Sequence, residues 1–216
     1  VVNGMTHVDI VPSKHIDNQS LAYRLDGLFA LTNAIQTKGA ITKLNVSDNV
    51  LGAKSFKAIV EALQSNQVLT ELDMARTYPL WDGMKHQDIS GIDAIVNAIP
   101  KMKAMTSLNL SNNDIRAVRG KALLEALRGN QAMKAINIAE NSFSINEEGS
   151  YDMTGVIGIR DAVLTMEALE KFTISGDFSN SKPITIETTM TEANFSSKDL
   201  GAEGAILLAA FLPKCR

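Results

Sequence analysis

The chain has 216 residues, a formal net charge of −3, 21% charged residues and 5% aromatic residues. A mildly acidic balance without a basic stretch argues against nucleic acid as the main partner, because phosphate neutralisation needs clustered Lys and Arg. No apolar run approaches the about 18 residues that a membrane span requires.

The single cysteine, Cys215, excludes a disulfide framework within the chain. This favours a reducing, intracellular location, and we expect the cytoplasm. The sequence begins at Val1 rather than Met. A location in an organelle therefore stays an open alternative.

A nine-residue template, LxxLxLxxN, recurs along the chain. It is clearest in ITKLNVSDN from Ile41 and in MTSLNLSNN from Met105. Copies start at residues 5, 41, 69, 105, 133 and 169, with a weaker seventh copy, MTEANFSSK, at 190. The starts lie 36, 28, 36, 28, 36 and 21 residues apart, and residues 41–104 align with residues 105–168 without a gap. Alternating short and long repeats therefore form a duplicated unit of 64 residues.

Each copy predicts one strand followed by one helix. Template positions four and six are apolar between polar neighbours, which is typical of a half-buried strand. Apolar residues at helical spacing follow, as in AIVEAL (58–63) and ALLEAL (122–127). We expect strands near 7–10, 43–46, 71–74, 107–110, 135–138, 171–174 and 192–195. Helices are expected near 26–37, 52–65, 90–101, 118–129, 154–167 and 201–212.

Stacking is required because one strand and one helix of this size cannot bury an apolar face alone. The predicted fold class is therefore α/β: a leucine-rich repeat solenoid, or horseshoe, of about seven repeats in a single domain, residues 1–216. Parallel strands line the concave face and helices line the convex face. We expect Leu44, Leu72, Leu108 and Ile136 to form one buried row. Residues 179–189 are expected to cross in an extended or irregular path. The last helix ends on an apolar face, which indicates an array that is cut or that docks its C-terminal end on something else.

The segments LNLSNNDI (108–115) with KALLEALRGN (121–130), and DLGAEGAILLAAFL (199–212), resemble the ribonuclease-inhibitor-like leucine-rich repeats. That superfamily includes the Ran GTPase-activating proteins and the repeat domains of NOD-like receptors. The resemblance covers about residues 5–212 and implies a horseshoe-shaped binding module. The chain departs from ribonuclease inhibitor itself, which has many cysteines and a longer array.

Template position nine is Asn49, Asn113 and Asn141 in the clearest copies. An amide side chain there can satisfy backbone groups of the neighbouring turn. Lys198 holds this position in the seventh copy and cannot act in the same way, so that copy is the least regular.

The long repeats carry about eight extra residues between strand and helix, near His15–Tyr23, Pro79–Gln87 and Phe143–Tyr151. Equivalent insertions emerge on one edge of a solenoid. Aromatic side chains on loops are typical of protein-binding anchors. The alternative is that each loop folds down and covers the shorter repeat beside it. The predicted edge-loop contacts are Tyr23, Tyr78, Trp81, His86, Phe143 and Tyr151.

The predicted concave face is small, polar and of mixed charge, without an aromatic anchor. It can hydrogen-bond to a partner segment, or its small residues can simply suit the inside of a curve. The concave residues expected to contact a partner are Lys43, Asn45, Glu71, Asp73, Asn109 and Asn137.

No pattern of residues indicates catalysis, a metal or a cofactor. His7, His15 and His86 lack metal-ligand spacing, and Glu147–Glu148 supply too few ligands for calcium. We therefore expect a protein-protein interaction or scaffold module, with a protein as the partner, in a larger assembly or alone. The alternative is a GTPase-activating regulator resembling the Ran activators, in which Arg76 would enter a phosphoryl-transfer site.

Overall fold

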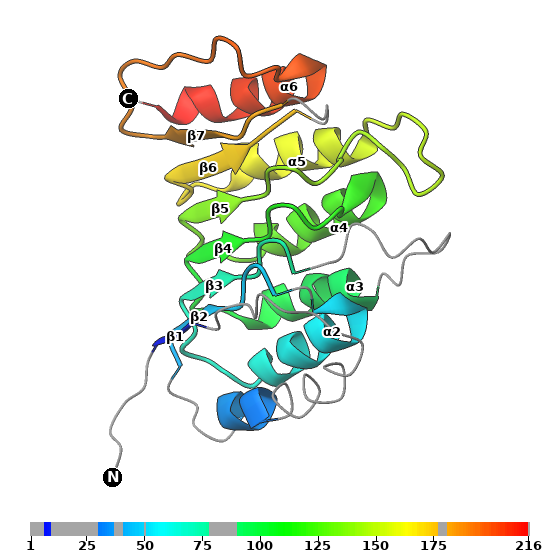
Figure 1. The fold of residues 1–216 in the computed structure, drawn as a ribbon. Helices are drawn as coiled ribbons and strands as arrows, with labels where there is room; N and C mark the ends of the chain where they lie inside the picture. The colour runs from blue at the N-terminus through cyan, green and yellow to red at the C-terminus, as the bar shows by residue number, and fades with distance from the viewer. Residues whose placement is uncertain are drawn as a thin grey trace.

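The architecture is taken from a computed structural model that describes residues 7–9, 30–36, 41–49, 51–77, 90–176 and 181–215. Seven strands form one sheet in sequence order, stacked one above the other (Figure 1). The strands are β1 His7–Asp9, β2 Lys43–Asn45, β3 Glu71–Asp73, β4 Ser107–Asn109, β5 Ala135–Asn137, β6 Lys171–Ile174 and β7 Ile184–Glu187.

Strands β1 to β6 pair in parallel, which confirms the first six predicted strands. The register joins equivalent template positions, as in Leu44 with Leu72 and Leu72 with Leu108. Leu44, Leu72, Leu108 and Ile136 are all at most 2% exposed, so the predicted buried row is confirmed.

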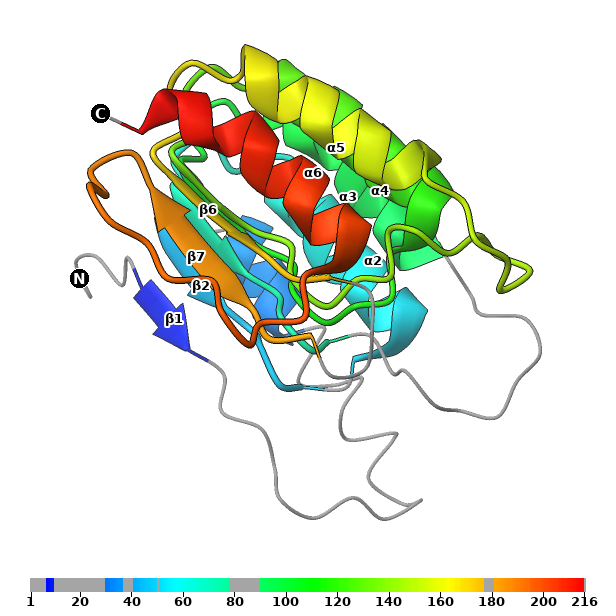
Figure 2. The ribbon, with the colours of Figure 1, turned by 90° about the horizontal axis from the view of Figure 1, so that it is seen from above.

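The helices cover one side of this sheet, as the view from above shows (Figure 2). Helical residues 30–36 come first in the described chain. Then follow α2 Gly52–Leu63, α3 Ser90–Ala98, α4 Arg116–Arg128, α5 Thr154–Thr165 and α6 Gly201–Phe211. Short 3-10 turns, η1 Ile99–Lys101 and η2 Leu212–Lys214, extend α3 and α6. None of the helices within the described ranges combines the length and the apolar character that a membrane crossing requires.

The core lies between sheet and helices, where each helix inserts its apolar stripe. Phe56, Ile95, Leu123 and Ile159 are fully buried there. Phe172 of β6 stacks on Phe211 of α6 with 5.9 Å between ring centroids, which holds the last helix on the sheet.

The seventh strand differs from the prediction. β7 lies at Ile184–Glu187 and pairs antiparallel to β6, whereas residues 192–195 form no strand. The expected parallel strand at 192–195 is therefore wrong. Ile184 and Ile186 point into the core opposite Ile174 and Phe172, and both are at most 4% exposed. The buried face of the ITIE segment carries two β-branched residues, which favour a strand. The corresponding apolar positions of the expected strand at 192–195 are Ala193 and Phe195, a weaker pair for a strand than the two isoleucines.

The seventh copy nevertheless keeps the turn of the repeat. The Asn194 side chain accepts a hydrogen bond from the Ser196 amide at 2.9 Å, as Asn45 does from Ser47 at 3.0 Å. Ser197 and Asp199 have positive φ angles, matching Asn112 and Asp114 in the copy from Met105. The template at Met190 thus specifies the turn but not the strand.

Buried asparagines tie successive repeats together at template position nine. The side-chain amide nitrogen of Asn113 donates to Met74 O at 2.8 Å and to Leu110 O at 3.0 Å, and the side-chain oxygen accepts from the backbone amide of Thr77 at 3.1 Å. The side-chain oxygen of Asn141 in turn accepts from the backbone amide of Asn113 at 2.8 Å. The predicted role of Asn at this position is confirmed.

A second pair of buried asparagines follows the helices of the short repeats. Asn66 donates to Ile41 O at 2.9 Å, and Asn130 donates to Met105 O at 3.0 Å. Sequence analysis missed both, although an Asn-Gln pair recurs at 66–67 and 130–131. These bonds join the end of each helix to the start of a strand.

Candidate protein-binding site

The edge loop that is fully described, residues 143–153, begins at a residue buried in the core. Phe143 is 4% exposed, and its ring lies over Gly120 of α4, where an added Cβ would come within 2.3 Å of it. The prediction that Phe143 contacts a partner is therefore wrong. Because Gly120 has no side chain, α4 leaves room for the ring, which anchors the base of the loop.

Beyond Phe143 the loop forms a small hairpin. Ile145 and Tyr151 form an antiparallel bridge, and the Asn146 amide donates to Ser150 O at 2.9 Å. The Asn146 side-chain oxygen accepts from the amides of Glu148 at 3.1 Å and Ser150 at 2.8 Å. Backbone and side-chain hydrogen bonds thus hold the tip together.

Asp152 joins this hairpin to α5. Its amide donates to Ser144 O at 2.8 Å, and its side-chain oxygen accepts from the Thr154 amide at 2.9 Å. The hydrogen bonds from Thr154 lower the pKa of the exposed Asp152 carboxyl below its ordinary value. The carboxylate is therefore ionised at neutral pH and accepts a hydrogen bond from the first residue of α5, whose N-cap position is held by Met153.

Two arginines of α4 fasten the hairpin to the helix layer. Arg116 donates to Glu147 O at 3.1 Å, and Arg119 forms an ion pair with Glu147 at 2.8 Å. The Arg119 side chain also lies 3.7 Å from Asp93 of α3. Sequence analysis missed these arginines, because the aligned positions 64 residues earlier are Gly52 and Ser55.

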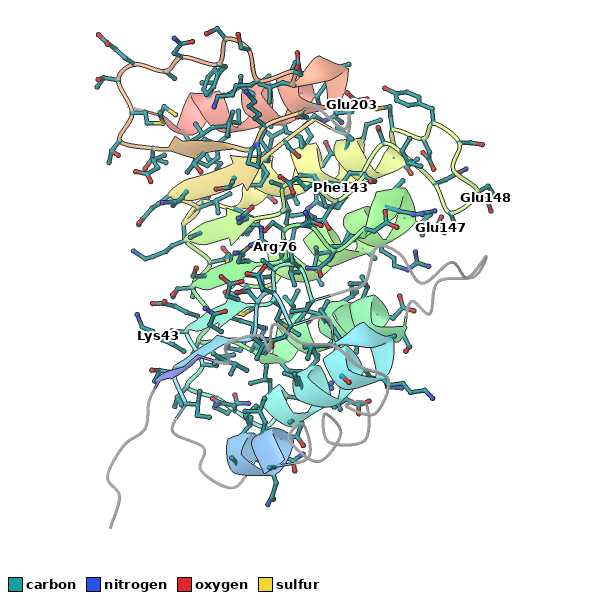
Figure 3. The ribbon with its side chains drawn as sticks, in the orientation of Figure 1. Lys43, Arg76, Phe143, Glu147, Glu148 and Glu203 are labelled. Carbon is teal, nitrogen blue, oxygen red and sulfur yellow. The ribbon has the colours of Figure 1, made fainter. Side chains whose placement is uncertain are left out.

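The fastened loop projects beyond the starts of α4 and α5 in both ribbon views (Figures 1 and 2). Glu148 marks its outer end, whereas Phe143 lies at its base (Figure 3). Tyr151 is 62% exposed. A rigid loop that displays a large aromatic side chain is a suitable protein-binding element, because little conformational entropy is lost on binding.

The other predicted edge-loop residues, Tyr23, Tyr78, Trp81 and His86, lie outside the described residues. The structure places none of them relative to Tyr151.

The predicted concave residues lie on β2 to β5, and many of their polar atoms are already engaged. Lys43 forms an ion pair with Glu71 at 2.6 Å, and the Asn109 amide donates to Asp73 at 3.0 Å. The side-chain oxygens of four residues accept from the backbone amide two positions on: Asn45, Asp73, Asn109 and Asn137. These residues hold the ends of their own strands, which accounts for their type without a partner.

Arg76 lies in the turn after β3, where it has a positive φ of 50° (Figure 3). It contacts Asp48 of the preceding repeat. Its guanidinium bonds both oxygens of the Asp48 carboxyl, through Nε to Oδ1 and through Nη2 to Oδ2 at 3.0 Å. This contact lowers the pKa of Asp48 and raises the pKa of Arg76. Both side chains are exposed, at 60% and 43%, and this surface ion pair accounts for the orientation of Arg76 without a partner.

The C-terminal end of the array presents the outer surface of α6. Ala202, Ala205, Ala209 and Leu212 are exposed there. The only charged residue of α6, Glu203, points inward and is 2% exposed. A cleft of about 880 Å³ beside this end is lined in part by Lys171 and Glu187, which form an ion pair at 2.9 Å.

Among the described residues, no group of three or more His, Cys, Asp and Glu side chains is placed to hold a metal ion.

Comparisons with known proteins agree with this architecture. A family model described as "Leucine Rich repeat" matches residues 102–123. The tropomodulin C-terminal domain of Caenorhabditis elegans superposes with a TM-score of 0.57 at 10% identity, covering 87% of this chain and 92% of that chain. A structure of leiomodin-1 actin-binding site 2 superposes with a TM-score of 0.55 at 17% identity, covering 88% and 87%. Among curated proteins, no sequence matches the chain. The fold is thus a leucine-rich repeat fold.

Proposed function

We propose that this chain is a non-catalytic protein-binding module and that its partner contacts the hairpin loop at residues 143–151. The observation that carries the proposal is Tyr151, 62% exposed on a loop that Arg116 and Arg119 fasten to α4. Aromatic side chains of this kind dominate the binding energy of many interfaces. The whole of residues 1–216 acts as one leucine-rich repeat domain in this proposal, in the cytoplasm.

The concave residues Lys43, Asn45, Glu71, Asp73, Asn109 and Asn137, and the exposed face of α6, are secondary contact surfaces in this proposal. So are the aromatic residues of the equivalent edge loops, Tyr78 and Trp81 above all. The concave residues contribute less binding energy than the edge loops in this proposal, because the charged and amide groups of the concave face already pair with one another.

Actin is the first partner to test, because the similar leiomodin-1 structure is named for an actin-binding site. The experiment measures binding of the chain to monomeric and to filamentous actin, with Tyr151→Ala as the test variant. If Tyr151 is an anchor, the variant loses about 2 kcal/mol of binding free energy, or about thirtyfold in Kd.

Val68→Ala is the matched control, because Val68 is 42% exposed and lies between α2 and β3. The control should bind as the unmodified chain does. Equal affinity of Tyr151→Ala and the unmodified chain, or no binding to either form of actin, counts against the proposal.

The GTPase-regulator alternative depends on Arg76, and the contact between Arg76 and Asp48 argues against it. Arg76→Ala would abolish stimulation of GTP hydrolysis if that alternative held. We propose instead that the chain does not stimulate hydrolysis at all.

A further inference from the structure

Exposed apolar side chains gather on the layer formed by α4 and α5. Six large apolar side chains are exposed within the described ranges, and four of them belong to α4, α5 or the loop leading into α5. Ile157 and Leu164 lie seven residues apart on α5, so they share one face of that helix. These four side chains are Val118 at 55%, Tyr151 at 62%, Ile157 at 40% and Leu164 at 54% exposure. Grouped apolar exposure of this kind marks interaction surfaces.

A groove runs between the two helices beside these residues. An added Cβ at Gly158 would lie 2.9 Å from Lys121 Cγ and 3.0 Å from Lys121 Cα, so this glycine allows the helices to approach closely. The cavity has a volume of about 170 Å³ and is lined by Lys121, Glu125, Arg128, Thr154, Ile157, Gly158 and Asp161. Small-molecule sites usually measure about 300–1,000 Å³. This groove therefore suits side chains of a protein partner better than a small molecule.

Charge changes along the groove. At the loop end, the Asp152 carboxylate accepts a hydrogen bond from the amide of the lining residue Thr154, and Glu148 lies further out on the same loop (Figure 3). Lys121 and Arg128 line the α4 wall, about 10 Å apart along the helix axis. Glu125 stands between them, and Asp161 is engaged by Arg160 at 2.7 Å. Neither Lys121 nor Arg128 has an ion pair within the described part of the chain. The surface is thus acidic at one end and has two available cations on its wall.

We propose that this groove receives an amphipathic helix of the partner protein, with basic residues over Glu148 and Asp152 and acidic residues over Lys121 and Arg128. Its apolar face covers Val118, Ile157 and Leu164, in the manner of helix-in-groove recognition. A helix with acidic residues near its N-terminus and basic residues near its C-terminus is favoured by its own macrodipole. The bound helix therefore runs antiparallel to α4 and α5. This inference rests on the proposed protein-binding function and names the chemistry of the partner segment.

The test uses two synthetic peptides of about five turns, each held helical by an i,i+4 cross-link. Both carry the same leucine face. One has Glu in its N-terminal half and Lys in its C-terminal half, and the other has the same Glu and Lys interleaved. Fluorescence anisotropy with the full chain should show about fivefold tighter binding of the first peptide, from two or three partly exposed ion pairs.

Ile157→Asp should weaken binding of the first peptide at least about tenfold, because it places a charge in the apolar contact. Val68→Asp, at a site of similar exposure outside the groove, should leave the Kd unchanged within about twofold. Equal binding of the two peptides, no binding of either, or no effect of Ile157→Asp would overturn the inference. If Tyr151→Ala weakens actin binding while Ile157→Asp does not, the inference fails and the proposed function stands.

Discussion

Replacing Asn113 with Ala removes a side chain that joins two repeats at the buried edge of the sheet. Asn113 is 0% exposed, donates to Met74 O and Leu110 O, and accepts from the Thr77 amide. The two carbonyls keep other donors, because Thr77 Oγ1 bonds Met74 O at 2.8 Å and Asn141 bonds Leu110 O at 2.9 Å. The Thr77 amide loses the acceptor that Asn113 supplies.

An unsatisfied buried donor costs about 1–3 kcal/mol. The weakened contacts at the two carbonyls add to that cost, so we expect the free energy of unfolding to fall by about 3 kcal/mol. For a chain of this length this lowers the Tm by about 6–12 °C. Urea denaturation followed by circular dichroism gives the free energy directly, provided that the m-value is unchanged.

Asn49→Ala is the matched control, since Asn49 holds the same template position but is only half-buried. Water can replace its bonds to Val46 O and Ser47 O, so we expect a loss of about 1 kcal/mol. If Asn113→Ala loses less than about 1 kcal/mol, or if Asn49→Ala loses as much, then the reasoning about buried donors is refuted.

Three further predictions concern the core, the repeat unit and one ion pair. Leu72→Ala and Leu108→Ala should each lower the free energy of unfolding by about 2–5 kcal/mol, since each leaves a cavity in the buried row; melting curves unchanged within about 1 °C would contradict that row. Deleting residues 41–104 should give a shorter chain that still melts cooperatively. Deleting residues 41–68 places two long repeats side by side, and this variant should melt at a lower temperature. If both variants have equal stability per residue, the 64-residue unit is not a structural unit. The Asp48 carboxyl should titrate below its ordinary pKa of 3.8 in an NMR pH series and return toward that value in Arg76→Ala. Because the pKa of Asp48 is lowered in the folded chain, the stabilisation that the Asp48–Arg76 ion pair gives the fold is present at neutral pH and is lost as the pH falls through this pKa. An unchanged Asp48 titration in Arg76→Ala would refute the contact.

The parts of the fold that follow a short sequence period could be predicted. Template position four places Leu72 and Leu108 inward because alternation and burial are coupled in a strand. Position nine places Asn113 and Asn141 in the turn because their amides can both donate and accept there. These rules are local, so they need no knowledge of the neighbouring repeat.

The errors arose where two local signals competed or where a distant residue decided the outcome. At the C-terminal end, the template at Met190 and the alternating segment at 184–187 both indicate a strand, and the better apolar pair occupies the sheet edge. Phe143 was assigned to a surface because it begins an inserted loop. Its burial depends on Gly120, which lies in the preceding helix and which no pattern in the loop reveals.

In the candidate site too, residues marked by a local signal could be predicted and residues defined by distant contacts could not. Tyr151 could be selected from the sequence as an aromatic residue on an insertion. The arginines that fasten its loop could not, because their partners are backbone carbonyls and Glu147, which only the stacked repeats bring together.

Amide hydrogen exchange of the chain with and without saturating actin tests the binding site most directly. We predict that protection on binding concentrates at residues 145–152 and along the exposed faces of α4 and α5. Protection confined to the concave strands β2 to β5, or absent from the whole chain, would contradict a binding site built on the hairpin loop.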